Sequence, residues 1–268
     1  MDQKTEARYP TYSLSWTTVL GLIGAIVGRR RRSFRRDACA CVARLRPPLR
    51  VEGEAYIPQR GPCLLTLNHY ARPGFRAWWL ALAVGAVVPA EVHWVMTAAW
   101  TFPDPLRSRL LTPLTRWLFA HIARVYGFTP MPPMPTFGTD EAANPTSAEL
   151  LERAAAVRRV LTWARQTPEP LLALAPEGRD TPGGVLSMPL SGSGRFMLHL
   201  ANLGFSIVPV GAFEADGRFC LRFGPPYVLT VPADLSAHAR DRAACEVVMS
   251  HLARQLPARL QGKWAVHQ

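Results

Sequence analysis

The sequence lacks the cysteine spacing of a disulfide scaffold or of a zinc site. Its five cysteines are an odd number, and no C-x-x-C pair occurs. The close pair Cys39-x-Cys41 has no second cysteine pair or histidine cluster to complete a zinc site. The histidines show no metal-ligand spacing either. We therefore expect reduced thiols in a reducing compartment and no metal.

The N-terminal region lacks an apolar run long enough to cross a bilayer. The uncharged stretch LSWTTVLGLIGAIVG spans residues 14–28, which is short of the roughly 20 residues that a membrane-spanning helix needs. No A-x-A cleavage site is visible, and the positive charges follow the apolar run instead of preceding it. These features argue against a cleaved signal peptide.

Lysine is scarce, and the positive charge that arginine supplies is concentrated in one window. Between Arg29 and Arg50 lie nine arginines and one acid, Asp37, which together give +8 of the formal net charge of +12. An arginine block beside an uncharged apolar segment favours a shallow anchor on an anionic membrane. We therefore expect a peripheral or monotopic protein on the cytoplasmic face of an anionic phospholipid membrane. A buried N-terminal helix with a solvated basic end is the alternative.

A basic window could also bind nucleic acid. However, neither an array of stacking aromatic residues nor a known nucleic-acid-binding motif accompanies the charge. We expect no nucleic-acid partner. If this expectation fails, the binding should depend on residues 1–50 and on salt.

The apolar periodicity predicts helices that alternate with short buried strands. Such alternation is typical of an α/β domain with a mixed, largely buried sheet flanked by helices. Because Pro47-Pro48 interrupts the N-terminal helices, we divide the chain into a helical membrane-anchor segment, 1–48, and an α/β domain, 49–268. The expected helices lie within 14–46 (two helices) and at 76–88, 106–126, 146–166, 192–203 and 239–260. The expected strands lie at 61–68, 92–100, 171–178, 205–214 and 218–224, and 127–145 should be an irregular loop.

Three clusters coincide with the predicted buried strands. Asn68-His69 follows the first strand, and Pro176-Glu177-Gly178-Arg179 follows the strand LLALA. A weaker third cluster, Pro209-Val210-Gly211, lies inside a later strand. Sites of open α/β sheets collect at the carboxyl ends of strands, so we expect the first two clusters to meet there.

The order of these clusters resembles that of the glycerophospholipid acyltransferases, typified by lysophosphatidic acid acyltransferase. That family carries an N-H-x-x-x-x-D block, a P-E-G-T-R block and a V-P-V strand. Here Asn68-His69 matches the first block, APEGR (Ala175–Arg179) matches the second without its threonine, and IVPV (Ile207–Val210) matches the third. The resemblance covers roughly residues 50 to 230.

The resemblance implies transfer of a fatty acyl group to the hydroxyl of a lysophospholipid such as 1-acyl-glycerol-3-phosphate. His69 would act as general base, since a histidine pKa lies near neutrality. The donor would be an acyl thioester of coenzyme A or of acyl carrier protein, a co-substrate rather than a bound cofactor. Glu177 and Arg179 would lie near the acceptor phosphate. The remaining candidates for substrate binding are Asn68, Arg72, Arg76 and Gly178.

The sequence departs from the family pattern at the acid of the first block. Four residues separate His69 from Gly74, where the family has aspartate, and no Asp or Glu occurs between Glu54 and Glu91. The family's arginine after a glycine is also missing beyond Gly127, although Arg124 lies just upstream.

Three interpretations remain open. First, a backbone carbonyl or a carboxylate distant in sequence, with Glu177 and Asp180 as candidates, could orient His69. Second, the chain could bind lipid or acyl-CoA without turnover. Third, Arg72 and Arg76 could contribute charge to a modified reaction.

Overall fold

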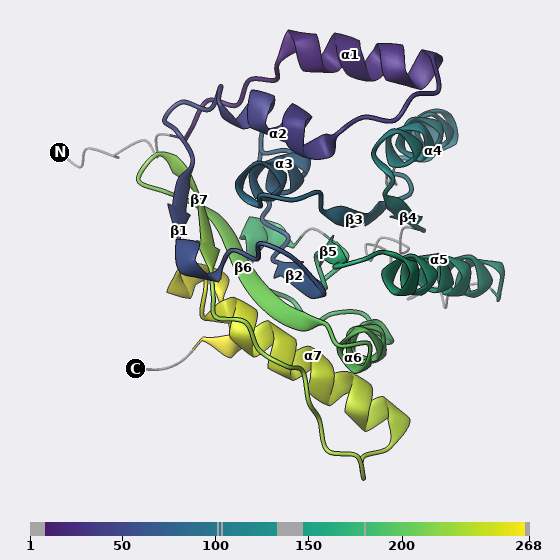
Figure 1. Cartoon of the computed structure of the whole chain (residues 1–268), viewed down its shortest axis with the longest axis vertical. Helices are drawn as coiled ribbons and strands as arrows, with labels where there is room; N and C mark the ends of the chain where they lie inside the picture. Colours follow the sequence, from purple (N-terminus) through teal and green to yellow (C-terminus); the bar gives the residue numbers. More distant parts are fainter. Residues whose placement is uncertain (1–8, 101, 103, 133–146, 180, 266–268) are drawn as a thin grey trace.

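The computed structural model describes residues 9–100, 102, 104–132, 147–179 and 181–265 (Figure 1). Within them, seven strands form one sheet in the order β1-β7-β6-β2-β5-β3-β4. The strands are β1 (Arg50–Glu52), β2 (Cys63–Leu67), β3 (His93–Thr97), β4 (Thr129–Met131), β5 (Leu171–Leu174), β6 (Ser206–Ala215) and β7 (Arg218–Phe223). Most neighbours are parallel, but β7 runs antiparallel to β6 and pairs in parallel with β1. The predicted mixed α/β architecture is confirmed.

Helices cover both faces of this sheet (Figure 1). They are α1 (Trp16–Val27), α2 (Phe34–Val42), α3 (Trp78–Val87), α4 (Pro105–Tyr126), α5 (Ser147–Gln166), α6 (Ser193–Asn202) and α7 (Ala237–Ala253). The side chains of Ser15, Ser33, Asp104 and Ser236 cap α1, α2, α4 and α7 by accepting a backbone amide. These caps satisfy amides that have no partner within the helix, so they determine where each helix begins.

The central strand β2 is buried on both faces because successive side chains point to opposite sides of the sheet. Leu65 and Leu67 pack with α2 and α3, whereas Leu64 packs with α5, α6 and α7. This double burial explains why the strand reads as a continuous apolar run. It also fixes the point at which the chain leaves the sheet, one residue before Asn68.

Two sequence expectations need correction. The region expected to be an irregular loop after Gly127 contains β4, which is too short and too rich in proline to show a period-two pattern. The last helix ends at Ala253 and not at residue 260, because Pro257 has no amide to continue it, and a separate 3-10 turn covers Ala258–Leu260. Residues 133–146, including the expected capping residue Thr146, lie outside the described residues.

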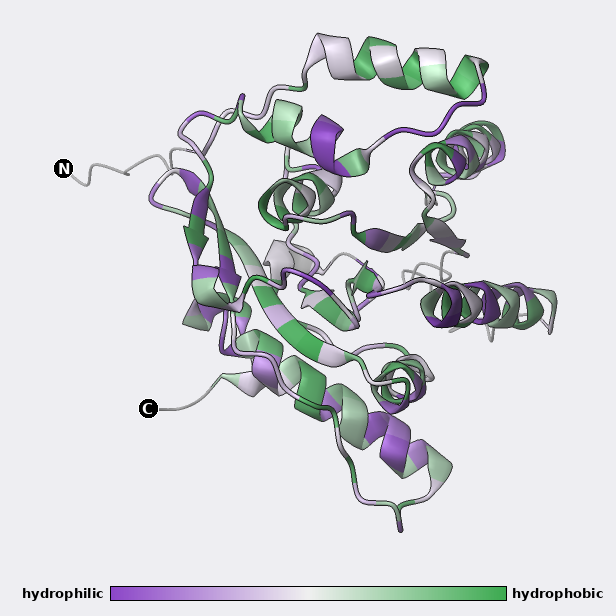
Figure 2. Cartoon of the chain, viewed as in Figure 1, coloured by the Kyte–Doolittle hydropathy of each residue, from purple (hydrophilic) through white to green (hydrophobic). Residues whose placement is uncertain are grey.

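The two predicted N-terminal helices are confirmed as helices, but they differ in environment. In α2, Phe34, Ala38 and Cys41 belong to the core shared with the sheet. Helix α1 lies at the outside of the molecule although it is mostly apolar (Figure 2), and Ala25 is its buried residue. Among the described helices, none combines the length and the apolar character needed to cross a membrane.

Candidate active site

The first two predicted clusters meet at the carboxyl edge of the sheet. Strand β2 lies between β5 and β6, with Thr66 opposite Leu174 and Leu67 opposite Val210. The residues that follow β2 and β5 therefore leave the sheet side by side. The topology brings together motifs that are more than 100 residues apart in sequence.

Asn68 extends the hydrogen bonding of β2 with its side chain. It is fully buried, its Nδ2 donates to the carbonyl of Ala212 at 2.9 Å, and its Oδ1 accepts from the amide of Ala212 at 2.7 Å. The side-chain amide of Asn68 thus pairs with both the backbone N–H and the backbone carbonyl of Ala212. Asn68, predicted as a substrate-binding residue, is placed where it fixes the chain immediately before His69.

Glu177 links the two motifs through backbone amides. Its carboxylate is buried, with Oε1 accepting from the His69 amide at 2.7 Å and Oε2 accepting from the Ser187 amide at 2.9 Å. Burial raises the pKa of the Glu177 carboxyl, although these amides and the nearby His69 charge oppose the rise. The hydrogen bond from the His69 amide fixes the backbone of His69 beside the Glu177 carboxylate.

The turn after Glu177 depends on glycine. Gly178 has a φ of 66°, and its amide donates to the Ala175 carbonyl at 3.1 Å, which closes a turn that contains Glu177. Arg179 is the next residue and is half-buried. Asp180, the other candidate to orient His69, lies outside the described residues.

The chain turns sharply at Gly74, five positions after His69. Gly74 is exposed and has a φ of 81°, a left-handed conformation that strongly favours glycine. A Cβ added there would lie 3.4 Å from Nη1 of Arg72. An aspartate could therefore occupy this position only with backbone strain.

The carboxylate nearest to this loop in the sheet is Glu214, which the sequence interpretation missed. Glu214 is buried near the end of β6 and accepts hydrogen bonds from the Tyr70 hydroxyl at 2.9 Å and from Arg72 Nη2 at 2.7 Å. Arg72 Nε also donates to it, and Tyr12 donates its hydroxyl at 2.6 Å. An acid within an otherwise apolar strand, IVPVGAFEA, was the signal that could have identified it.

The two arginines predicted to contribute charge are placed differently. Arg72 directs its guanidinium at Glu214 and donates from Nη1 to the Pro73 carbonyl at 2.7 Å, so its donors serve contacts within the protein. Arg76 is exposed, with its guanidinium carbon 5.9 Å from the centre of the Trp78 ring. Arg76 and Arg179 are thus the more accessible of the predicted cations.

The third predicted cluster serves packing. Pro209 lies opposite Thr66 inside the sheet, and a Cβ at Gly211 would come within 2.2 Å of the Gln255 carbonyl oxygen. Gly211 therefore allows the chain after α7 to approach β6 closely. Within the described residues, no group of histidine, cysteine, aspartate or glutamate side chains could hold a metal ion.

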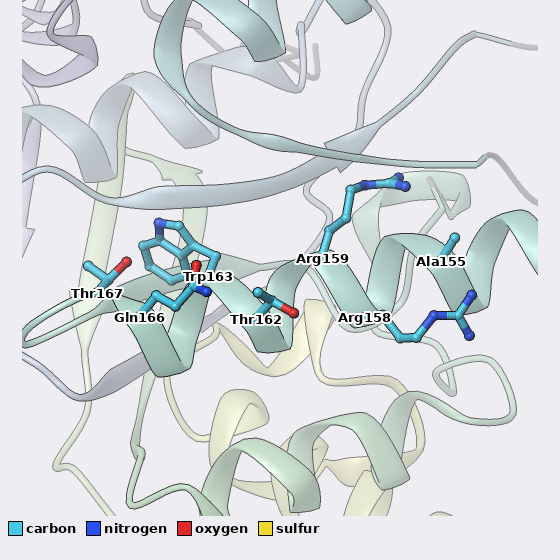
Figure 3. A pocket seen from close by; sticks show the side chains of 7 residues that line it. All are labelled: Ala155, Arg158, Arg159, Thr162, Trp163, Gln166 and Thr167. Carbon is cyan, nitrogen blue, oxygen red and sulfur yellow. The ribbon is translucent and has the colours of Figure 1, made fainter.

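A cavity of about 470 Å³ lies along α5, away from this edge (Figure 3). It is lined by Ala155, Arg158, Arg159, Thr162, Trp163, Gln166 and Thr167. The lining residues belong to α5 and to Thr167, which precedes β5, and include neither His69 nor Glu177. Behind the cavity, Trp163 stacks on buried His93, whose pKa burial lowers to about 4. The cavity and the motif residues are therefore separate features.

Comparison with known proteins finds similarity to solved structures but not to known sequences. No protein-family model matches the sequence, and no curated protein sequence matches it. The crystal structure of the 1-acyl-sn-glycerophosphate (LPA) acyltransferase PlsC from Thermotoga maritima is similar at 13% sequence identity and a TM-score of 0.45, covering 90% of this chain and 84% of that chain. Because a likeness of this degree describes only a similar arrangement of elements, the functional argument depends on the motifs and their geometry.

Proposed function

We propose that the protein is an acyltransferase that moves a fatty acyl group from an acyl thioester to the hydroxyl of a lysophospholipid such as 1-acyl-glycerol-3-phosphate. The observation that carries this proposal is the 2.7 Å hydrogen bond between the His69 amide and Glu177. It joins the N-H and P-E-G motifs at the carboxyl edge of the sheet, although 108 positions separate the two residues.

In this mechanism His69 removes the proton from the acceptor hydroxyl, whose oxygen attacks the thioester carbonyl. The C–S bond then breaks, the thiolate of coenzyme A or of acyl carrier protein takes the proton back from the His69 imidazolium, and no covalent enzyme intermediate forms. Glu177 holds the histidine backbone and stabilises the imidazolium that develops on the ring. Arg179 and Arg76 supply positive charge for the acceptor phosphate.

The substrate suggests a membrane surface, and two exposed apolar stripes could provide the contact. On α1, Trp16, Leu20, Ile23 and Val27 are exposed and lie at the i, i+4, i+7 spacing of one helix face. On α4, which contacts α1, the exposed residues Leu106, Leu110, Leu114 and Trp117 lie at i, i+4, i+8 and i+11, which also places them along one helix face. Exposed arginines 29–31 follow α1. We infer that both stripes dock on the cytoplasmic face of an anionic membrane.

A second candidate function is lipid or acyl-CoA binding without turnover. The observation that favours it is the glycine at position 74 together with the contact of Glu177 to the backbone of His69. A base of this kind whose ring no carboxylate orients would lose much of its efficiency. This candidate predicts binding of acyl-CoA but no product with any acceptor.

The deciding experiment measures transfer of labelled acyl groups from acyl-CoA, and separately from acyl carrier protein, to lysophosphatidic acid. His69→Ala should lower the rate by about 10²- to 10⁴-fold, the contribution typical of a general base. His238→Ala, which changes an exposed histidine at the start of α7, is the matched control. Equal rates for wild type and His69→Ala would exclude His69 as the base, and binding without product would favour the second candidate.

Membrane docking is measured on the same preparations by flotation with anionic and zwitterionic vesicles. Leu20→Glu and Leu110→Glu should each weaken binding to anionic vesicles. Leu151→Glu is the control, because Leu151 is similarly exposed but lies on α5. Equal binding by all three variants would contradict the docking surface.

A further inference from the structure

The loop after His69 is held by a carboxylate that lies more than 140 positions away in the sequence. Glu214 on β6 accepts from Tyr70 and from the fork of Arg72, one and three residues after His69. The loop contains no acid of its own, because no Asp or Glu occurs between Glu54 and Glu91. Glu177 thus holds the backbone amide of His69, and Glu214 holds the side chains of two residues that follow it.

Burial gives this contact the strength and the geometry of a rigid support. The Arg72 and Glu214 side chains are 14% and 4% exposed, so little water competes for the paired donors and acceptors. Contact with Glu214 raises the pKa of Arg72, and burial raises the pKa of Tyr70, so both residues remain donors at physiological pH. A bidentate arginine contact restricts orientation as well as distance.

The same carboxylate also receives the segment that leads into α1. Tyr12 donates its hydroxyl to Glu214, and the Arg72 guanidinium carbon lies 3.8 Å from the centre of the Tyr9 ring. The backbone of Thr11 bridges to Arg46, after α2. The N-terminal segment, β6 and the loop after His69 therefore converge on one buried acid.

We propose that Glu214 is a positioning residue for acyl transfer, which holds the loop from His69 to Gly74 in the orientation that aims the imidazole at the acceptor hydroxyl. This inference rests on the proposed function. It assigns to a strand distant in sequence the support that a nearby acid supplies in the acyltransferase motif. The effect is on the geometry of the reacting groups and not on substrate binding.

The test compares Glu214→Gln with the double variant Glu214→Gln/Arg72→Gln in the acyl-transfer assay and in thermal unfolding. The single variant leaves a buried guanidinium without its counterion, so its Tm should fall further below that of wild type than the Tm of the double variant does. The double variant removes that unpaired charge and should recover part of the Tm. Both variants should lose about 10- to 100-fold in kcat, the range expected for a displaced catalytic group, while KM changes less than about threefold.

A matched pair of variants elsewhere separates positioning from stability. Asp37→Asn and Asp37→Asn/Arg32→Gln alter a second buried carboxylate that binds an arginine fork and a tyrosine. Their Tm should fall comparably while kcat stays within about twofold of wild type, since a stable fold alone does not aim His69. If kcat of the Glu214 double variant recovers together with its Tm, or if KM rises while kcat is unchanged, the proposal is wrong. If wild-type activity itself does not depend on His69, the proposed function fails instead.

Discussion

Glu214 and Asp37 are both buried carboxylates that accept an arginine fork and tyrosine hydroxyls, but they connect the chain on different scales. Asp37 pairs with Arg32, five residues away on the entrance to α2, and with Tyr126 of α4. Glu214 binds Tyr70 and Arg72 over 142 to 144 positions and Tyr12 over 202. The same chemistry thus joins the entrance of α2 to α4 in the first case and assembles three segments that are more distant in sequence in the second.

Complete removal of each carboxylate gives the largest expected effect. Glu214→Ala leaves a buried arginine and two tyrosine hydroxyls without their acceptor and should reduce the free energy of unfolding by about 3–5 kcal/mol. Asp37→Ala leaves one arginine and one tyrosine hydroxyl without their acceptor, so its loss of unfolding free energy should lie at the lower end of that range. Urea denaturation of both variants measures the difference. A larger loss of unfolding free energy for Asp37→Ala would show that the loss does not depend on how many donors are left without an acceptor.

Glu177 sharpens the comparison because backbone amides, and not an arginine, hold its carboxylate. Its raised pKa means that the folded protein binds the proton more tightly than the unfolded chain, so the associated stability is full below about pH 4.3 and is lost as pH rises through the folded pKa. Glu177→Gln abolishes this pH dependence and turns an amide donor toward the amide of His69 or Ser187. The resulting loss should be about 1–3 kcal/mol.

The measurement is urea unfolding of wild type and Glu177→Gln between pH 4 and pH 8. The stability gap between the two proteins should narrow as pH rises, since only wild type loses the contribution of the protonated carboxyl. Parallel curves over this range would mean that the Glu177 carboxyl titrates at an ordinary pKa.

The smallest expected effect comes from the tyrosine hydroxyls. Tyr12→Phe and Tyr126→Phe each remove one hydrogen bond to a buried carboxylate, of 2.6 Å and 2.9 Å, and should each cost about 1 kcal/mol in thermal unfolding. Acyl transfer should decline with Tyr12→Phe and stay unchanged with Tyr126→Phe. Equal rates for the two variants would indicate that the Tyr12 contact plays no part in positioning.

The two strands that precede the motifs could be predicted from the sequence. β2 and β5 are continuous apolar runs that end at Asn68-His69 and Pro176-Glu177, and polar residues after buried strands indicate an edge of the sheet. The lateral order of strands was not predictable, because register and neighbour choice depend on packing between distant segments. For that reason Glu214, which belongs to β6, could not be linked to the loop of Arg72 from the sequence.

The contacts of individual side chains were likewise not predictable from the sequence. The prediction that Arg72 contributes charge to the reaction remains untested, and its donors serve Glu214 and the Pro73 carbonyl. Its guanidinium faces Glu214 only because β6 lies next to β2, a neighbourhood that no local pattern encodes. The left-handed backbone at Gly74 was also hidden, because a motif comparison concerns residue types and not backbone conformation.

The convergence of residues 9–12 on Glu214 has a practical consequence for work on this protein. Removing the apolar helix α1 to improve solubility would be an obvious step, since α1 contributes little to the core. A deletion that begins at the first residue would also take away Tyr9 and Tyr12, which contact the arginine and the acid behind the His69 loop. Replacing exposed residues of α1, such as Trp16 and Leu20, while retaining Tyr9 and Tyr12 is the safer route to a more soluble protein that keeps the contacts of Glu214.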